Sequence, residues 1–164
     1  MEVKDFLEKI SSYNIFNHLL PGTVFCVIGT HISNISFLQN DLLSGFFIYY
    51  LVGVIISRIG SIIVEPTFKL TRFVIFAPYE KYIEASKKDP KIDTLSETNN
   101  MYRTLTSLFI CLVTLKLYMF LCNYYPWISE YREHAVFLVL LLMFSLSYRK
   151  QTKYIKSRVE KNSQ

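Results

Sequence analysis

The chain has 164 residues, a formal net charge of +5 and a composition that is 51% hydrophobic and 16% aromatic. A soluble domain of this length does not usually need so much Phe and Tyr, or several apolar runs near membrane-spanning length. The composition therefore excludes an ordinary soluble domain and predicts an all-α membrane protein. The N-terminus lacks a positive region followed by an apolar core, so no cleaved signal peptide is expected.

The first predicted element is an amphipathic helix over residues 3–17, within an N-terminal segment 1–18. Its apolar residues recur at three- and four-residue steps, at Phe6, Ile10, Tyr13 and Phe16. Such a helix lies either on the inner leaflet or against the cytoplasmic part of the protein, and the pattern does not favour one of these over the other.

Four apolar segments then approach the length of about 20 residues that a spanning helix needs. The first two, residues 19–37 and 42–64, fall within a membrane region 19–65. The other two, residues 104–124 and 135–148, fall within a second membrane region 104–148. The fourth segment is short and reaches spanning length only with residues that precede it.

Basic residues are concentrated in the stretch 66–103 and in the tail 149–164, whereas the two short loops between spans carry almost none. Positively charged loops stay in the cytoplasm. The pattern thus predicts a multi-pass protein of the bacterial inner (cytoplasmic) membrane with both termini cytoplasmic. An aromatic belt is predicted at the outer interface, at Tyr124, Tyr125, Trp127 and Tyr131.

The cytoplasmic stretch 66–103 is predicted to be helical. Pro66 is expected to break or kink the second span at Glu65. Pro78 suits the first turn of a short helix whose last turn carries Lys87 and Lys88. After the Asp-Pro stop at 89–90, Thr94 is predicted to be the N-cap of a capping box. No Pro or Gly follows until well past residue 103, which predicts one long helix that continues into the third span.

The second span carries polar and small residues in an otherwise apolar segment. Gly53, Ser57, Ser61 and Glu65 follow each other at four-residue steps, so they form one ridge where another helix can approach closely. Arg58 lies on nearly the same face as Glu65, and each is expected to find a partner outside its own helix.

Lys116 places a second cation within a span. Arg58 and Lys116 either extend to the headgroups or form a structural ion pair, or they line a water-filled path. Such a path would need several copies arranged with rotational symmetry, so a homo-oligomer is expected.

The sequence nominates no enzyme, cofactor or metal. It contains no HExxH, GxSxG, P-loop or GxGxxG motif and no Cys/His cluster at ligand spacing. Cys26, Cys111 and Cys122 fall in apolar runs and are interpreted as small core residues.

A basic face with interleaved tyrosines is the candidate ligand site of the cytoplasmic stretch. Cations neutralise phosphates and tyrosines stack on single-stranded bases. The candidates are Lys87, Lys88, Lys91, Arg103, Tyr79, Tyr82 and Tyr102. Ordinary positive-inside topology with attraction to anionic lipid explains the same charges equally well.

The stretches "ISRIGSIIVEP" and "FAPYEKYIEASKKDPKIDTLSETNNMYRT" resemble small bacterial anti-phage membrane effectors, in particular the membrane component of Hailong-type defence systems. The resemblance covers about residues 53–104. It implies an oligomeric, ion-channel-like complex, with a tetramer favoured. It also implies a partner nucleotidyltransferase whose short oligonucleotide product controls the complex, so that activation kills the infected cell (abortive infection). It assigns no pore or ligand residue.

Three hypotheses follow from these observations. The first is a ligand-controlled, channel-like effector in the lipid bilayer. The second is a non-conducting membrane adaptor or assembly subunit, in which the small-residue ridge only packs helices. The third is a small lipid-modifying enzyme, for which no motif is present. Ion flux through liposomes separates the first from the other two.

Overall fold

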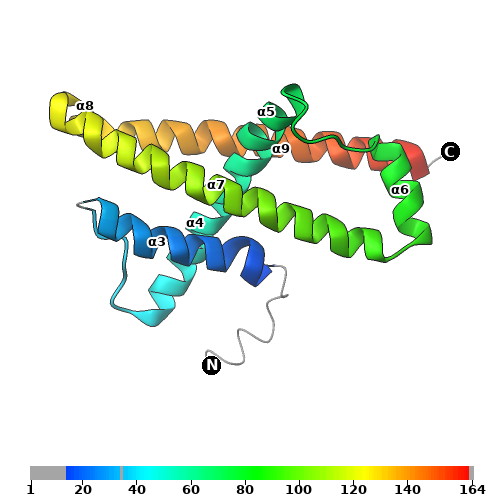
Figure 1. The fold of residues 1–164 in the computed structure, drawn as a ribbon, viewed down its shortest axis with the longest axis horizontal. Helices are drawn as coiled ribbons and strands as arrows, with labels where there is room; N and C mark the ends of the chain where they lie inside the picture. Colours follow the sequence, from blue (N-terminus) through cyan, green and yellow to red (C-terminus); the bar gives the residue numbers. More distant parts are fainter. Residues whose placement is uncertain (1–13, 34, 163–164) are drawn as a thin grey trace.

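The computed structural model describes residues 14–33 and 35–162, and these form helices without a strand (Figure 1). The predicted all-α class is therefore confirmed. Most of the predicted amphipathic helix over 3–17 lies outside the described residues. Its last part belongs to a π-helical stretch, η1 (Ile15–Leu19), that runs without a break into α3 (Leu20–Ile32). The first apolar helix therefore ends at Ile32, earlier than residue 37.

The second span is one continuous rod in three parts, namely α4 (Leu42–Ile59), the π-helical η2 (Gly60–Val64) and α5 (Glu65–Leu70). Its start is capped by Asp41, whose carboxylate accepts a hydrogen bond from the Ser44 backbone N–H at 2.8 Å. A break or kink was predicted at Glu65, and the break does not occur. In η2 the N–H groups bond five residues back, as Glu65 does to Gly60. This register removes the clash between a proline ring and the carbonyl four residues earlier, so the helix continues past Pro66.

The stretch predicted to be cytoplasmic contains α6 (Tyr79–Lys88), with Lys87 and Lys88 in its last turn as predicted. Pro78 is its N-cap, so it precedes the first turn in which it was predicted. The next helix, α7 (Lys91–Tyr124), starts earlier than predicted, with Pro90 at its N-cap. Thr94 therefore lies inside the helix and is not its cap. The reason is local: Pro90 has a φ already suited to a helix, and the Asp89 side chain accepts the Lys91 N–H at 3.0 Å.

The predicted long helix is confirmed, because α7 has 34 residues without a break. At 1.5 Å per residue it is about 51 Å long, well beyond the roughly 30 Å of a hydrocarbon core. A short turn of helix, α8 (Trp127–Glu130), leads into α9 (Arg132–Asn162). α9 contains both the predicted fourth span and nearly all of the basic tail, so the described part of the tail is helical.

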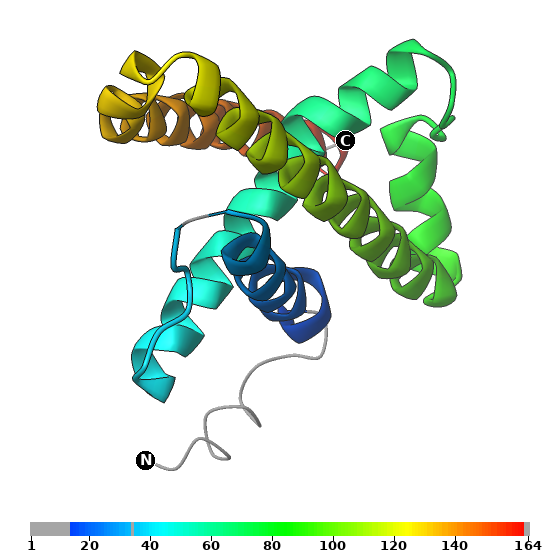
Figure 2. The ribbon, with the colours of Figure 1, turned by 60° about the vertical axis from the view of Figure 1, so that its left-hand side comes forward.

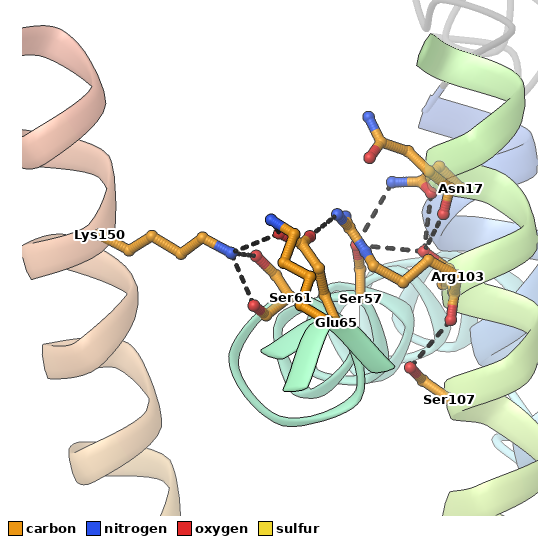
Figure 3. Close-up of polar contacts among 10 residues, drawn as sticks. Asn17, Ser57, Ser61, Glu65, Arg103, Ser107 and Lys150 are labelled. Atoms are coloured by element: carbon orange, nitrogen blue, oxygen red, sulfur yellow. Dashed lines mark hydrogen bonds and ion pairs between the residues drawn. The ribbon is translucent and has the colours of Figure 1, made fainter. Parts of the chain in front are cut away.

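The rod α4–η2–α5 crosses α7, and it passes between α7 and α9 where Glu65 lies (Figures 2 and 3). α3 packs against both α4 and α7. A small apolar core of Ile56, Leu108 and Leu112 lies at this crossing. α6 lies near the C-terminal end of α9, so the two basic segments lie together (Figure 1).

Three helical segments of the described chain are long and apolar enough to cross a membrane: Ile15–Ile32, Leu42–Leu70 and Lys91–Tyr124. These support a membrane protein. The predicted fourth span is not among them, because the apolar first half of α9 is followed by a strongly basic second half.

Candidate functional site

Glu65 is the centre of a cluster of charges that joins three helices (Figure 3). Its side chain is only 8% exposed. Its two carboxylate oxygens pair with Lys69 Nζ at 2.7 Å, Arg103 Nη1 at 2.7 Å and Lys150 Nζ at 3.5 Å. The cations come from α5, α7 and α9. One carboxylate thus faces three cations, and the cluster retains net positive charge.

The local backbone explains how Lys150 reaches this site. In the π-helical register the carbonyl of Ser61 would accept a hydrogen bond from residue 66, but Pro66 has no N–H. Lys150 Nζ takes this place and donates to the Ser61 carbonyl at 2.6 Å, and it also lies 2.8 Å from Ser61 Oγ. Burial lowers the pKa of Lys150, and the neighbouring Glu65 carboxylate opposes this shift.

A second polar network lies next to the charge cluster, deeper among the helices. Thr104 Oγ1 donates to Asn17 Oδ1 at 2.8 Å, and Ser57 Oγ lies 3.4 Å from Asn17 Nδ2 and 3.3 Å from Thr104 Oγ1. All three side chains are buried. They join η1, α4 and α7 through polar contacts, in a region where an unpaired polar group would be costly.

The predicted ridge of small residues lies where helices of the same chain approach each other. A Cβ atom on Gly53 would overlap the backbone carbonyl of His18, and one on Gly60 would lie 2.5 Å from Ser107 Oγ. Ser57 belongs to the polar network and Ser61 contacts Lys150. All four residues of the ridge therefore make contacts with other helices of the same chain.

The other intramembrane cations lie apart from this cluster. Arg58 is half-buried in α4, and Lys116 is exposed on α7. Among residues 14–33 and 35–162, neither forms a hydrogen bond or an ion pair. The expectation of a partner for Arg58 on another helix or subunit thus stays a prediction.

The predicted ligand face is divided by the fold. Lys87, Lys88 and Lys91 are exposed around the turn between α6 and α7. Arg103 is twelve residues further along α7, about 18 Å away along the axis, and it is held by Glu65. The exposed Tyr102 lies next to it.

The tyrosines of α6 are partly engaged in packing. Tyr79 stacks on Tyr82 and contacts Tyr154 of α9, with ring centroids 6.3 Å and 5.5 Å apart respectively. At the end of α9, Lys161 forms an ion pair with Glu84 at 2.8 Å. The hydrogen bond from Lys161 holds the pKa of Glu84 below its ordinary value. This ion pair partly neutralises the negative charge of Glu84 near Lys87, Lys88 and Lys91.

Sequence reasoning found Glu65 but missed most of its surroundings, notably Lys69, Lys150, Asn17 and Thr104. One signal was available, because a single acid in an apolar run requires cationic partners. The basic residues of the tail were interpreted only as a sign of topology, so Lys150 was not considered. No group of residues that could hold a metal ion occurs in the described part of the chain.

Comparison with protein-family models, with curated proteins and with solved structures finds no match to this chain.

Proposed function

We propose that the protein is a channel-like membrane effector, built from several copies of the chain and controlled from its basic side. The observation that carries the proposal is the buried polar site around Glu65. Ionisable groups within membrane helices are costly and mark functional paths more often than they mark simple packing. Here a carboxylate, three cations and a hydrogen-bonded network lie along the same crossing of helices.

The unbroken α7 supports control from the basic side. Lys91 at its start belongs to the exposed lysine face, Arg103 binds Glu65, and the remainder forms a candidate span. A ligand that moves the start of α7 would therefore displace Arg103 relative to Glu65 without any hinge between them.

Exposed apolar side chains support an assembly of copies in a bilayer. Along α7 and α9 many large apolar residues face outward, among them Phe109, Val113, Phe137 and Leu141. One chain encloses little space at its crossing, so a continuous path requires neighbouring copies.

Anti-phage defence, the oligonucleotide ligand and the partner nucleotidyltransferase are proposed from the resemblance over residues 53–104. In this proposal the phosphates bind at Lys87, Lys88 and Lys91. Binding should weaken with salt, with a log–log slope of about −0.7 for each neutralised phosphate. Reversal of Lys87 and Lys88 to Glu should flatten this slope and leave membrane insertion intact.

The test is ion flux from dye-loaded liposomes that contain the full-length protein, with and without short single-stranded oligonucleotides. We expect flux above that of empty liposomes, and a change when the oligonucleotide is added. Glu65→Gln should alter the flux. Glu130→Gln, which changes an exposed acid of α8 beyond the C-terminal end of α7, serves as its matched control. Flux equal to that of empty liposomes under both conditions would contradict a channel.

A second candidate function is a non-conducting membrane adaptor. One observation favours it: Glu65 has its cations, and the small-residue ridge has its helix contacts, within a single chain. An adaptor would assemble normally, give no flux, and lose partner binding when the helix crossing is disrupted.

A further inference from the structure

The segment that follows the second span forms a groove with an unusual combination of side chains. The Lys69–Phe76 groove has a volume of about 590 Å³ and is lined by Lys69, Arg72, Val74, Ile75 and Phe76. Cations lie among aliphatic and aromatic side chains. Residues 66–79 contain no Asp or Glu, so the groove supplies no acidic group of its own to balance these charges.

The backbone of this segment folds back on α5. Arg72 has a φ of 60°, in the left-handed region, and thereby reverses the chain direction. The N–H groups of Phe73 and Val74 then donate to the Phe68 carbonyl at 2.9 Å and 3.3 Å. The Phe73 ring packs on that of Phe68, with centroids 4.9 Å apart. The backbone of the loop that forms the groove is therefore held by hydrogen bonds and by a ring contact.

Large apolar side chains at the end of α5 and in the loop after it are highly exposed, which is unfavourable in water. Leu70 is 85% exposed, Phe73 75% and Ile75 89%. Leu70 is the last residue of a candidate membrane span, and Phe73 and Ile75 follow directly after it. A span that ends at Leu70 would bring the loop to the boundary between headgroups and acyl chains, where apolar side chains are buried in lipid and cations meet phosphates.

Lys69 and Arg72 can each donate further hydrogen bonds to a bound anion. Lys69 Nζ donates to Glu65 and lies 4.1 Å from the centre of the Phe76 ring, and its side chain is 42% exposed. An ammonium group has three donors, so further hydrogen bonds remain possible. Arg72 is exposed, and within the described chain it has no ion pair.

From these observations we infer that the Lys69–Phe76 groove binds an anionic phospholipid, with the lipid phosphate against Lys69 and Arg72 and the side chains of Leu70, Phe73 and Ile75 among the acyl chains. The exposed aliphatic residues Leu70 and Ile75 and the end of the span favour a lipid over a nucleic acid, because aliphatic side chains offer bases no stacking surface. Since Lys69 also pairs with Glu65, a bound lipid would compete for one of the three cations around the buried carboxylate. Lipid binding itself does not depend on whether the assembly conducts ions.

The test uses the full-length protein in a neutral detergent, with phosphatidylglycerol and phosphatidylcholine present in equal amounts. Native mass spectrometry then gives the ratio of the two lipids that the protein retains. We expect a preference for phosphatidylglycerol. Arg72→Asn should lower this preference about fivefold, because each cation near an anionic headgroup contributes about that factor. Asn keeps the left-handed backbone accessible, so the loop should stay folded.

Two further variants separate charge from insertion. Ile75→Ser should weaken retention of both lipids about fivefold and leave their ratio unchanged, and the fold should tolerate it because Ile75 is exposed. Lys153→Gln removes an exposed cation of α9 that does not line the groove, and it should change neither quantity.

Three results would overturn the inference. The first is an unchanged lipid preference in Arg72→Asn. The second is competition by soluble glycerol 3-phosphate at the affinity of the lipid, which would define a simple anion site. The third is displacement of the lipid by a short single-stranded oligonucleotide with higher affinity, which would assign the groove to nucleic acid.

Discussion

At the scale of single residues, the structure depends on polar groups that satisfy each other where water is scarce. Glu65 holds Arg103 of α7 and Lys150 of α9, which are distant in sequence. A buried carboxylate of this kind stabilises the fold only while its partners remain, because an unpaired buried charge is costly. The same carboxylate separates three cations that would otherwise repel each other.

Glu65→Gln should therefore destabilise the folded chain by about 3 kcal/mol, because three cations then share a site without an acid. Lys69→Gln should cost less than about 1 kcal/mol, since Lys69 is partly exposed and Arg103 and Lys150 remain. Denaturant titration in detergent micelles, followed by circular dichroism, measures both. Equal stability of Glu65→Gln and wild type would show that solvent reaches the cluster.

A substitution at Gly53 tests the close contact between η1 and α4. Gly53→Ala should destabilise the protein by about 1–3 kcal/mol, because the added methyl group meets the His18 backbone, which cannot move like a side chain. Gly45→Ala is the matched control in the same helix, where the added atom meets only side chains, the Tyr49 ring at 3.3 Å and Gln39 Cβ at 3.6 Å. The melting temperatures of the two variants give the comparison, and equal values would place the helices further apart than described.

At the scale of elements, the apolar runs and the breaker residues predicted most helices from the sequence. The runs at 42–64 and 104–124 are helical, and α6 lies between Pro78 and Asp89 as expected. Two local rules failed. Pro66 did not end its helix, because a π-helical turn precedes it, and Thr94 did not cap α7, because Pro90 already does. In both places the residues just before the predicted boundary decide where the helix ends or begins.

The partners of Glu65 were not predictable from local patterns. Lys150 is 85 residues away in sequence, and nothing in the basic tail distinguishes it from its neighbours. Arg103 is predicted on the ligand face as one of the basic residues of the cytoplasmic stretch, yet the fold directs it to Glu65. Pairing across such distances is decided by how the helices cross, which the sequence periodicity does not contain.

Pro66→Ala tests the attachment of α9 to the second span. An alanine N–H at this position can bond the Ser61 carbonyl, which now accepts from Lys150. Lys150 should lose this hydrogen bond, and α9 should be held less firmly. Distances between spin labels on α9 and α5 should become broader, while the overall helix content stays constant. An unchanged distance distribution would mean that the Glu65 contact alone fixes α9.

At the scale of the whole molecule, the position of Lys150 bears on the number of spans. α7 leads away from Arg103 towards Tyr124, and α9 returns until Lys150 reaches Glu65 (Figures 1 and 3). The start of α7 and the second half of α9, which both carry basic residues, therefore lie on the same side of the molecule. Such a return favours a fourth crossing of the membrane over a chain that stays outside.

Cysteine labelling of intact cells tests this topology in a background where Cys26, Cys111 and Cys122 are replaced by Ser. With four spans, Gln39→Cys and Ile128→Cys should react with an impermeant maleimide, and Lys88→Cys and Lys156→Cys only after the cells are permeabilised. With three spans, Lys156→Cys would react in intact cells. Labelling at position 156 thus decides between the two arrangements.

The π-helical turn at Gly60–Val64 also changes how tolerant the second span is to a change of length. Such a turn contains one residue more than an α-helical turn. The side chains before and after it therefore point in the same directions as in a regular α-helix that lacks this extra residue. Loss of one residue within 60–64 would leave Glu65 directed at α7 and α9. Loss of one residue within α4 would instead turn every following side chain by about 100°. The span thus has one place where its length can vary by a residue while its charged end stays in position.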